Sequence, residues 1–232
     1  MIITTRATRG TAVAAVAVLA LSGGVLSACA SAEAEGTSHA HSSSAHANAK
    51  HAEDSSAVTA LHSAMRTLWA PHMEWTYATV VAFAGDSPAL QATITRLLRN
   101  QADIGTAVAG YYGPAAGKQL TDLLTTHINE AVPVLTAAKA GDTAALTKAV
   151  DDWYANAQAI ADFLSSANPA WKQGEMRQMM KEHITQTIGY ASAALGGNYA
   201  DAVTKYDEAE AHMTEMADML SDGIVAQFPA KF

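Results

Sequence analysis

Cysteine is nearly absent from this chain of 232 residues, because Cys29 is the only one. With no second cysteine, no internal disulfide can form and no multi-cysteine metal site is available. Basic residues are also scarce, with 14 Lys and Arg against 22 Asp and Glu and a net charge of −8. An acidic chain without a basic stripe binds nucleic acid poorly, so nucleic acid is not an expected partner.

The N-terminal residues have the pattern of a bacterial export signal. Arg6 and Arg9 precede the apolar run 11–21, which is shorter than the roughly 20 apolar residues that a membrane span requires. Residues 26–29 then read LSAC, the pattern of a lipoprotein box. We therefore predict removal of residues 1–28, acylation of Cys29, and attachment to the outer face of the cell membrane through that lipid anchor. Removal takes away two arginines and no acids, so the charge of −8 becomes −10.

A polar segment follows the predicted cleavage point. Residues 30–54 consist mainly of Ala, Ser, His and Glu and contain no large apolar side chain. Such a segment does not bury enough surface to offset its ordering entropy, so we expect 29–54 to be a flexible tether ahead of a folded domain at 55–232. Imidazoles on a flexible chain can also gather around a transition metal, the alternative being a purely solvating spacer. The candidate residues are His39, His41, His46 and His51.

Beyond residue 54 the pattern is helical, because apolar residues recur at spacings of three and four and the alternation typical of strands is missing. Turn-forming sequences divide this region into six predicted helices, at about 55–84, 88–109, 115–140, 143–166, 174–195 and 198–222. Helices joined by short turns pack as an up-down bundle, so we predict an all-α domain of three helical hairpins. Pro71 and Pro133 fall inside predicted helices and are expected to kink or interrupt them.

A repeated spacing suggests that the three hairpins are related. His72, His127 and His183 stand 55 and 56 residues apart, each on the first helix of a hairpin. The second helices carry a polar residue 28, 29 and 29 positions after the corresponding histidine, namely Asn100, Asn156 and His212.

This spacing predicts a metal site, because helical bundles build such sites from inward side chains on facing helices. His72, His127 and His183 could point to one place in the core, and three imidazoles suit Zn, Fe or Cu. Glu130, three residues after His127, and His212 on the last helix are candidate additional ligands. The alternative is that each histidine is hydrogen-bonded in the core or lies at the surface.

Methionine adds a second indication in the third hairpin. Two stripes share the spacing i, i+4, i+7, namely Met176, Met180 and His183, and His212, Met216 and Met219. Thioethers together with imidazoles favour copper, and Met180 and Met216 are the candidate soft ligands. The alternative is that these flexible side chains fill an irregular core.

Motifs for other chemistries fail. The run 113–119 approaches a phosphate-binding loop, but it has one residue too few between its glycines and Gln119 where Ser or Thr is needed. The chain has no nucleophile elbow of the Gly-x-Ser-x-Gly type. A nucleotide cofactor is therefore not expected.

Several short stretches carry a family resemblance, and together they cover nearly all of the chain after residue 65. They are LWAPHMEWT (68–76), RLLRNQADIG (96–105), YYG (111–113), LLTTHI (123–128), WYANA (153–157) and GIVAQFPAKF (223–232). With these the chain resembles a family of uncharacterised bacterial all-helical proteins, some labelled acetylglutamate kinase although they lack kinase motifs. The resemblance implies an all-α domain and transfers no catalytic residue.

Three functions remain open at this stage. The first is a lipid-anchored protein whose helical domain binds a transition metal through histidines. The second is a non-catalytic interaction module of the cell envelope, which predicts a large exposed apolar or aromatic patch and histidines that are scattered or packed in the core. The third, a metal-dependent enzyme, requires an open coordination position beside a pocket and is the least favoured.

Overall fold

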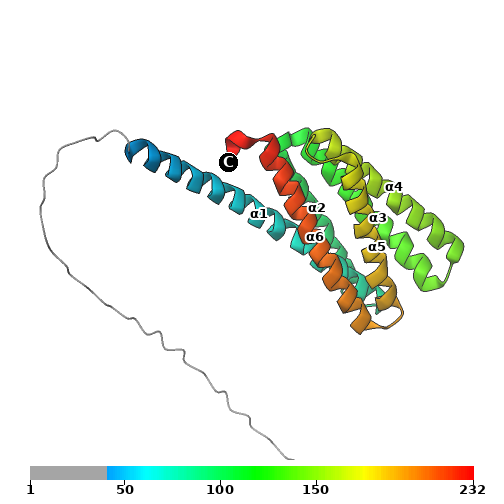
Figure 1. The fold of residues 1–232 in the computed structure, drawn as a ribbon. Helices are drawn as coiled ribbons and strands as arrows, with labels where there is room; N and C mark the ends of the chain where they lie inside the picture. The colour runs from blue at the N-terminus through cyan, green and yellow to red at the C-terminus, as the bar shows by residue number, and fades with distance from the viewer. Residues whose placement is uncertain (1–40) are drawn as a thin grey trace, which may run out of the picture. The chain divides into compact units, whose positions relative to one another are not determined.

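The computed structural model describes the backbone of residues 41–232 and the side chains from residue 56 onward. Within that part the chain forms six α-helices, a final 3₁₀ turn and no strand, which confirms the predicted all-α bundle (Figure 1). The elements are α1 (His41–Ala84), α2 (Leu90–Tyr112), α3 (Pro114–Ala140), α4 (Thr143–Ala167), α5 (Gln173–Leu195), α6 (Tyr199–Gln227) and η1 (Pro229–Lys231).

Some sequence predictions fall outside the described residues. The signal segment, Cys29 and His39 lie in residues 1–40, and the side chains of His41, His46 and His51 are likewise not described. Lipidation and metal capture by the tether therefore stay predictions. None of the helices in residues 41–232 is long and apolar enough to cross a membrane.

The helix boundaries follow the sequence signals closely, with one large difference. α1 begins at His41 rather than near Ser55, so the second half of the expected tether is helical. This stretch is rich in alanine, the strongest helix former, although it lacks large apolar side chains. Pro71 and Pro133 lie inside α1 and α3, which continue through them without interruption.

The caps at the later turns explain where α4 and α6 begin. Oδ1 of Asp142 accepts a hydrogen bond from the backbone N–H of Ala145 at 3.0 Å. Oδ1 of Asn198 accepts one from the N–H of Asp201 at 3.3 Å. Each side chain accepts a hydrogen bond from a backbone N–H that has no partner within the first helical turn. The starts of α4 and α6 therefore depend on residues next to them in the sequence.

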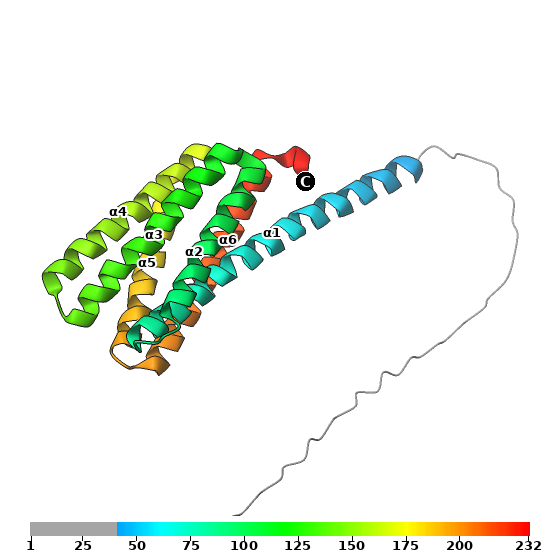
Figure 2. The ribbon, with the colours of Figure 1, turned by 180° about the vertical axis from the view of Figure 1, so that it is seen from behind.

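Each helix packs against its neighbour in sequence, and the last one returns to the first (Figure 2). α2 packs on α3, α3 on α4, α4 on α5 and α5 on α6. Nδ2 of Asn100 in α2 donates to the carbonyl of Leu68 in α1 at 3.0 Å. Because α6 also contacts α1, the bundle is closed around one core.

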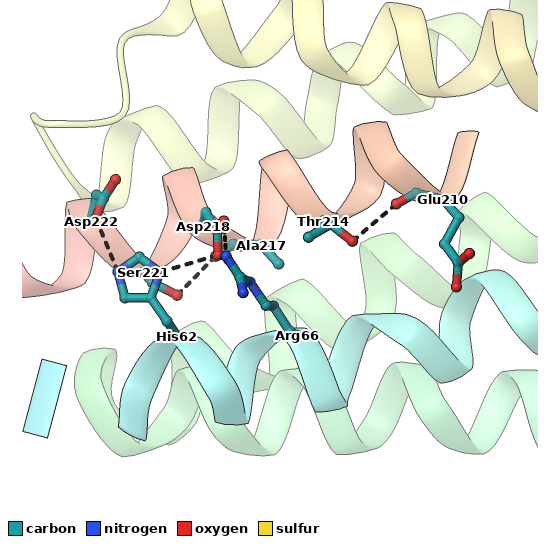
Figure 3. A network of polar contacts seen from close by, with 8 residues as sticks. All are labelled: His62, Arg66, Glu210, Thr214, Ala217, Asp218, Ser221 and Asp222. Atoms are coloured by element: carbon teal, nitrogen blue, oxygen red, sulfur yellow. Dashed lines mark hydrogen bonds and ion pairs between the residues drawn. The ribbon is translucent and has the colours of Figure 1, made fainter. Parts of the chain in front are cut away.

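Ion pairs join α6 to α1 (Figure 3). Arg66 Nε donates to Asp218 Oδ1 at 2.7 Å, and its second nitrogen binds the other carboxylate oxygen. His62 lies 3.1 Å from Asp218 through Nδ1 and 3.1 Å from Asp222 through Nε2. The Arg66 hydrogen bond lowers the pKa of Asp218. His62 and Arg66 of α1 thus bind two carboxylates of α6, Asp218 and Asp222.

Two glycines bring the α2 and α3 backbones into contact. A Cβ atom on Gly105 would lie 2.6 Å from the carbonyl oxygen of Gly117, and one on Gly117 would lie 2.4 Å from the carbonyl oxygen of Gly105. Real Cβ atoms do not approach so closely, so this helix crossing requires glycine on both sides.

The core is mainly apolar, but a few polar side chains are buried within it. They are His72, Asn100, Gln101, His127, Asn156, Asn168, His183, Thr187 and Ser221. Buried polar groups are costly unless they are hydrogen-bonded. Three of these nine residues are the histidines of the sequence repeat, so these three candidate metal ligands lie in the core.

Candidate functional site: a buried histidine cluster

The structure brings the three repeat histidines together. The ring of His183 on α5 lies 5.7 Å, centroid to centroid, from that of His72 on α1 and 5.7 Å from that of His127 on α3. Their exposed fractions are only 2%, 2% and 3% for His72, His127 and His183. One buried imidazole thus comes from the first helix of each hairpin, and we call this group the histidine cluster.

The hydrogen bonds around the cluster repeat from hairpin to hairpin. In each one, a polar side chain on the second helix contacts the backbone carbonyl four residues before the histidine. The pairs are Asn100 with Leu68 at 3.0 Å, Asn156 with Leu123 at 3.2 Å, and His212 with Met179 at 3.0 Å. The residues identified from the spacing of 28 and 29 positions therefore play equivalent structural parts.

His127 is held by the side chain of Asn156. The Asn156 amide nitrogen donates to the carbonyl of Leu123, so its oxygen faces His127 and accepts from Nδ1–H at 2.9 Å. This fixes the tautomer, because the proton on Nδ1 leaves the lone pair of the neutral ring on Nε2. Trp153 supports the same segment by donating from Nε1 to the His127 carbonyl at 2.8 Å.

His72 has a different partner, Gln101, which follows it by 29 positions. The Gln101 amide nitrogen lies 3.3 Å from His72 Nδ1 and donates to the carbonyl of Leu97 at 2.8 Å. In this orientation Nδ1 of His72 is the acceptor and Nε2 carries the proton. The amide oxygen of Gln101 is buried without a partner.

His183 lacks the partner that the other two rings have. Its Nδ1 is buried and makes no hydrogen bond, because His212, at the equivalent position on α6, instead contacts the Met179 carbonyl. Among the described residues, no hydrogen bond involves Nε2 of any ring in the cluster. The third hairpin therefore presents a buried imidazole whose Nδ1 has no hydrogen-bond partner.

Burial keeps the cluster neutral. Desolvation lowers the pKa of His72 to about 3, with a further contribution from His127 and a smaller opposing one from Gln101. Desolvation lowers the pKa of His127 to about 4, partly offset by Asn156. For His183, desolvation together with His72, His127 and His212 lowers the pKa well below its usual value. At neutral pH each ring has a lone pair and no charge.

Small cavities adjoin the cluster. One of about 20 Å³ has all three histidines in its lining, together with Met65, Met180 and Met216. Another of about 40 Å³ is lined by the same histidines and by Thr76, Thr79 and Thr187, among others. A water-sized species needs at least about 10–15 Å³, so each cavity has room for a single ion or very few waters, and not for an organic substrate.

The structure also places the other candidate ligands. Met180 and Met216 line the 20 Å³ cavity, whereas His212 is partly buried on α6 and held by the Met179 carbonyl. Glu130 lies away from these side chains, in an outer groove with Lys148, Asp152 and Asn156. Burial, and then Asp152, raises the pKa of Glu130. The potential ligands that line the 20 Å³ cavity are therefore the neutral nitrogens of the cluster and the sulfurs of the methionines.

The geometry also limits what the histidines can do alone. Within the described part of the chain, no three His, Cys, Asp or Glu side chains are arranged to hold a metal ion. The rings are adjacent, but a shared ion requires them to turn about their side-chain bonds or to be joined by thioether sulfurs. Because Nδ1 of His183 makes no hydrogen bond, this ring loses none by turning, and the methionines in the cavity lining supply the thioether sulfurs.

Comparison with known proteins identifies no relative of this chain. No family model, curated protein or solved structure matches this chain. The resemblance to uncharacterised helical proteins therefore stays a prediction.

Two residues of the site were missed from the sequence. Gln101 contacts the His72 ring, although the residue singled out there was its neighbour Asn100. A uniform spacing of 29 would have selected it, because Asn156 and His212 also follow their histidines by 29 positions. Met65 lines the same cavity as Met180 and Met216 and had no distinguishing sequence signal.

Proposed function

We propose that this protein is a lipid-anchored, exported metal-binding protein whose helical domain holds one transition-metal ion at the histidine cluster. The observation that carries the proposal is the convergence of His72, His127 and His183 from three separate hairpins into one buried group. Packing alone does not call for three adjacent imidazoles, because each brings a desolvation cost that an apolar side chain would avoid.

The protonation states support binding. A metal ligand must be a neutral imidazole, and the lowered pKa values keep the rings neutral at physiological pH. His127 already has the arrangement typical of a ligand, in which Nδ1–H donates to a side-chain oxygen and Nε2 carries the lone pair. His72 reaches the same state if the Gln101 amide turns to accept from Nδ1–H.

The surroundings favour binding over catalysis. Cavities of about 20 and 40 Å³ leave no space for a substrate beside the rings. The alternative of an interaction module has less support, because the exposed large hydrophobic residues of the described part are only Val132, Tyr199 and Val203.

Metal analysis tests the proposal on the full mature chain, with His39, His41, His46 and His51 replaced by asparagine to silence the tether. We expect about one Cu, Zn or Fe ion per chain after desalting and a higher melting temperature with metal, because a ligand that binds only the folded state stabilises it. Replacing His183 with leucine should abolish both effects. The control His62→Asn, which alters a histidine in the α1–α6 ion pairs, should keep them. Absence of stoichiometric metal together with unchanged melting would reject the proposal.

The anchor is tested separately. Cys29→Ser should move the protein from the membrane fraction to the soluble fraction and remove the acyl mass from the mature N-terminus. A membrane fraction that is unchanged by this substitution contradicts lipidation.

A further inference from the structure

Methionine is distributed unevenly over the helices. Among the residues with described side chains, all eight lie on α1, α5 and α6, and residues 90–167, which make up α2, α3, α4 and their connections, contain none. They are Met65, Met73, Met176, Met179, Met180, Met213, Met216 and Met219. If methionine only filled gaps, both halves of the core would be expected to use it.

Three of these methionines meet the histidine cluster. Met65, Met180 and Met216 come from three different helices and line the same 20 Å³ cavity as the three imidazoles. They are 5%, 4% and 2% exposed. The lining contains no carboxylate, and Glu130, the carboxylate considered as a ligand from the sequence, lines an outer groove. The ligands available to an ion in this cavity would thus be thioethers and neutral imidazoles, and the rest of the lining is apolar or aromatic.

From this donor set we propose that the metal is Cu(I), bound by His183 together with the Met180 and Met216 thioethers. The inference rests on the proposed function, because it names the ion that the same site takes. Imidazole suits Zn, Fe and Cu alike, but soft thioether ligands select Cu(I), so the two methionines decide the choice.

Charge leads to the same choice. A buried ion without an anionic ligand keeps its full charge in a medium of low polarity, at a cost that rises steeply with that charge. A monovalent ion therefore costs less to bury in this cavity than a divalent ion. The neutral lining of this cavity favours Cu(I) over Cu(II) and Zn(II) on electrostatic grounds, independently of ligand softness.

The third hairpin is the preferred position for the ion. His183 has an unpartnered Nδ1, whereas Nδ1 of His72 and of His127 is occupied by Gln101 and Asn156. Met180 precedes His183 by three residues on α5, so both lie on neighbouring faces of that helix. Met216 comes from α6, which packs directly on α5. Binding here leaves the hydrogen bonds of the other two hairpins unchanged.

The test uses the full mature chain with the four tether histidines replaced by asparagine. Cu(I) is titrated without oxygen against a chromogenic Cu(I) chelator, and Zn(II) against a zinc indicator. The double variant Met180→Leu/Met216→Leu removes both sulfurs at nearly constant volume. Its control, Met73→Leu/Met213→Leu, changes two buried methionines that are not in the lining of the 20 Å³ cavity. Thermal melting of each apoprotein verifies that both variants fold.

We expect one equivalent of Cu(I), weaker Zn(II) binding, and copper X-ray absorption that shows sulfur neighbours. The cavity variant should lose Cu(I) affinity by roughly tenfold or more, and the control should not. Zn(II) binding as tight as Cu(I), with affinity insensitive to Met180 and Met216 and only nitrogen neighbours, overturns the Cu(I) inference while the metal site itself stands. Absence of binding by every metal removes the site and this inference together.

Discussion

The side-chain oxygen of Asn156 accepts a hydrogen bond from Nδ1 of His127 at 2.9 Å, and the same amide donates to the carbonyl of Leu123 at 3.2 Å. One side chain therefore orients the ring and ties α4 to the backbone of α3. In the first hairpin this work is divided between two neighbours, Asn100 and Gln101. The second hairpin depends on a single residue for both contacts.

Replacing Asn156 with leucine should destabilise the protein by about 1–3 kcal/mol. The substitution leaves Nδ1 of His127 buried without a partner, which costs the desolvation of that group, and it removes the added hydrogen bond from Asn156 to the Leu123 carbonyl. Urea unfolding at pH 7.5 measures the change. Gln158→Leu, an exposed position on the same helix, should stay within about 0.5 kcal/mol of the parent. Equal effects of the two substitutions would contradict the role given to Asn156.

Acid should weaken the fold well above the pH at which carboxylates titrate. The histidines have a pKa near 6.5 when unfolded, and about 3 and about 4 for His72 and His127 when folded. Between these values the unfolded chain binds more protons, so stability falls as pH drops below 6.5. Each ring contributes about 1 kcal/mol per pH unit in that window.

Urea unfolding at pH 7.5, 6.5 and 5.5 tests this prediction, and histidine NMR signals should show the buried rings still neutral at pH 5.5. The variant His127→Gln should have a shallower pH dependence, because one titrating group is gone. Asp218 and Asp162, whose pKa values are lowered by Arg66 and Arg177, lose their contribution only in more acidic solution. A stability independent of pH from 7.5 to 5.5 would show that the rings are not buried as described.

The ion pairs between α1 and α6 should contribute modestly and in a salt-dependent way (Figure 3). Asp218→Asn should cost about 0.5–1 kcal/mol at low ionic strength, because Arg66 and Asp218 are partly exposed and solvent screens them. The loss should shrink in 1 M NaCl, where screening acts within about 3 Å. Asp122→Asn, which breaks the exposed pair with Lys118, should cost less. A loss that persists in high salt would argue against an electrostatic origin.

The glycine contact between α2 and α3 predicts opposite effects at two positions on one helix. Gly105→Ala should destabilise by about 1–3 kcal/mol, because the new methyl group would lie 2.6 Å from the Gly117 carbonyl oxygen. Gly110→Ala should be neutral or stabilising by up to about 1 kcal/mol, because no atom lies within 4 Å of its Cβ position. Thermal unfolding of the two variants side by side gives the comparison, and a tolerated Gly105→Ala would mean that the helices can separate.

Much of the fold could be predicted because its signals are local. Asp142 and Asn198 cap helices through their own side chains, and glycines mark the turns at 141 and 196–197. The start of α1 was predicted too late, because the absence of apolar residues was given more weight than the helix propensity of alanine. The unbroken helices at Pro71 and Pro133 show that surrounding structure can tolerate one missing backbone bond.

Sequence spacing predicted which histidines meet in the core, but it did not predict their contacts with other helices. The nearly equal spacing of His72, His127 and His183, 55 and 56 residues, identified the residues that meet in the core. It could not place Glu130, because three residues turn a helix by about 300° and leave that side chain about 60° away, toward α4. Which ring has a partner also depends on contacts between helices, so the unpaired His183 could not be anticipated.

The spacing of the three histidines has a further consequence for how the domain assembles. The rings are 55 and 56 residues apart and belong to different hairpins, so no single hairpin holds more than one of them. Contacts between residues so distant in sequence carry a large loop-closure cost and require the hairpins to dock. A nascent chain that ends after α4 contains His72 and His127 but not yet His183. The three rings therefore come together only after all three hairpins have docked.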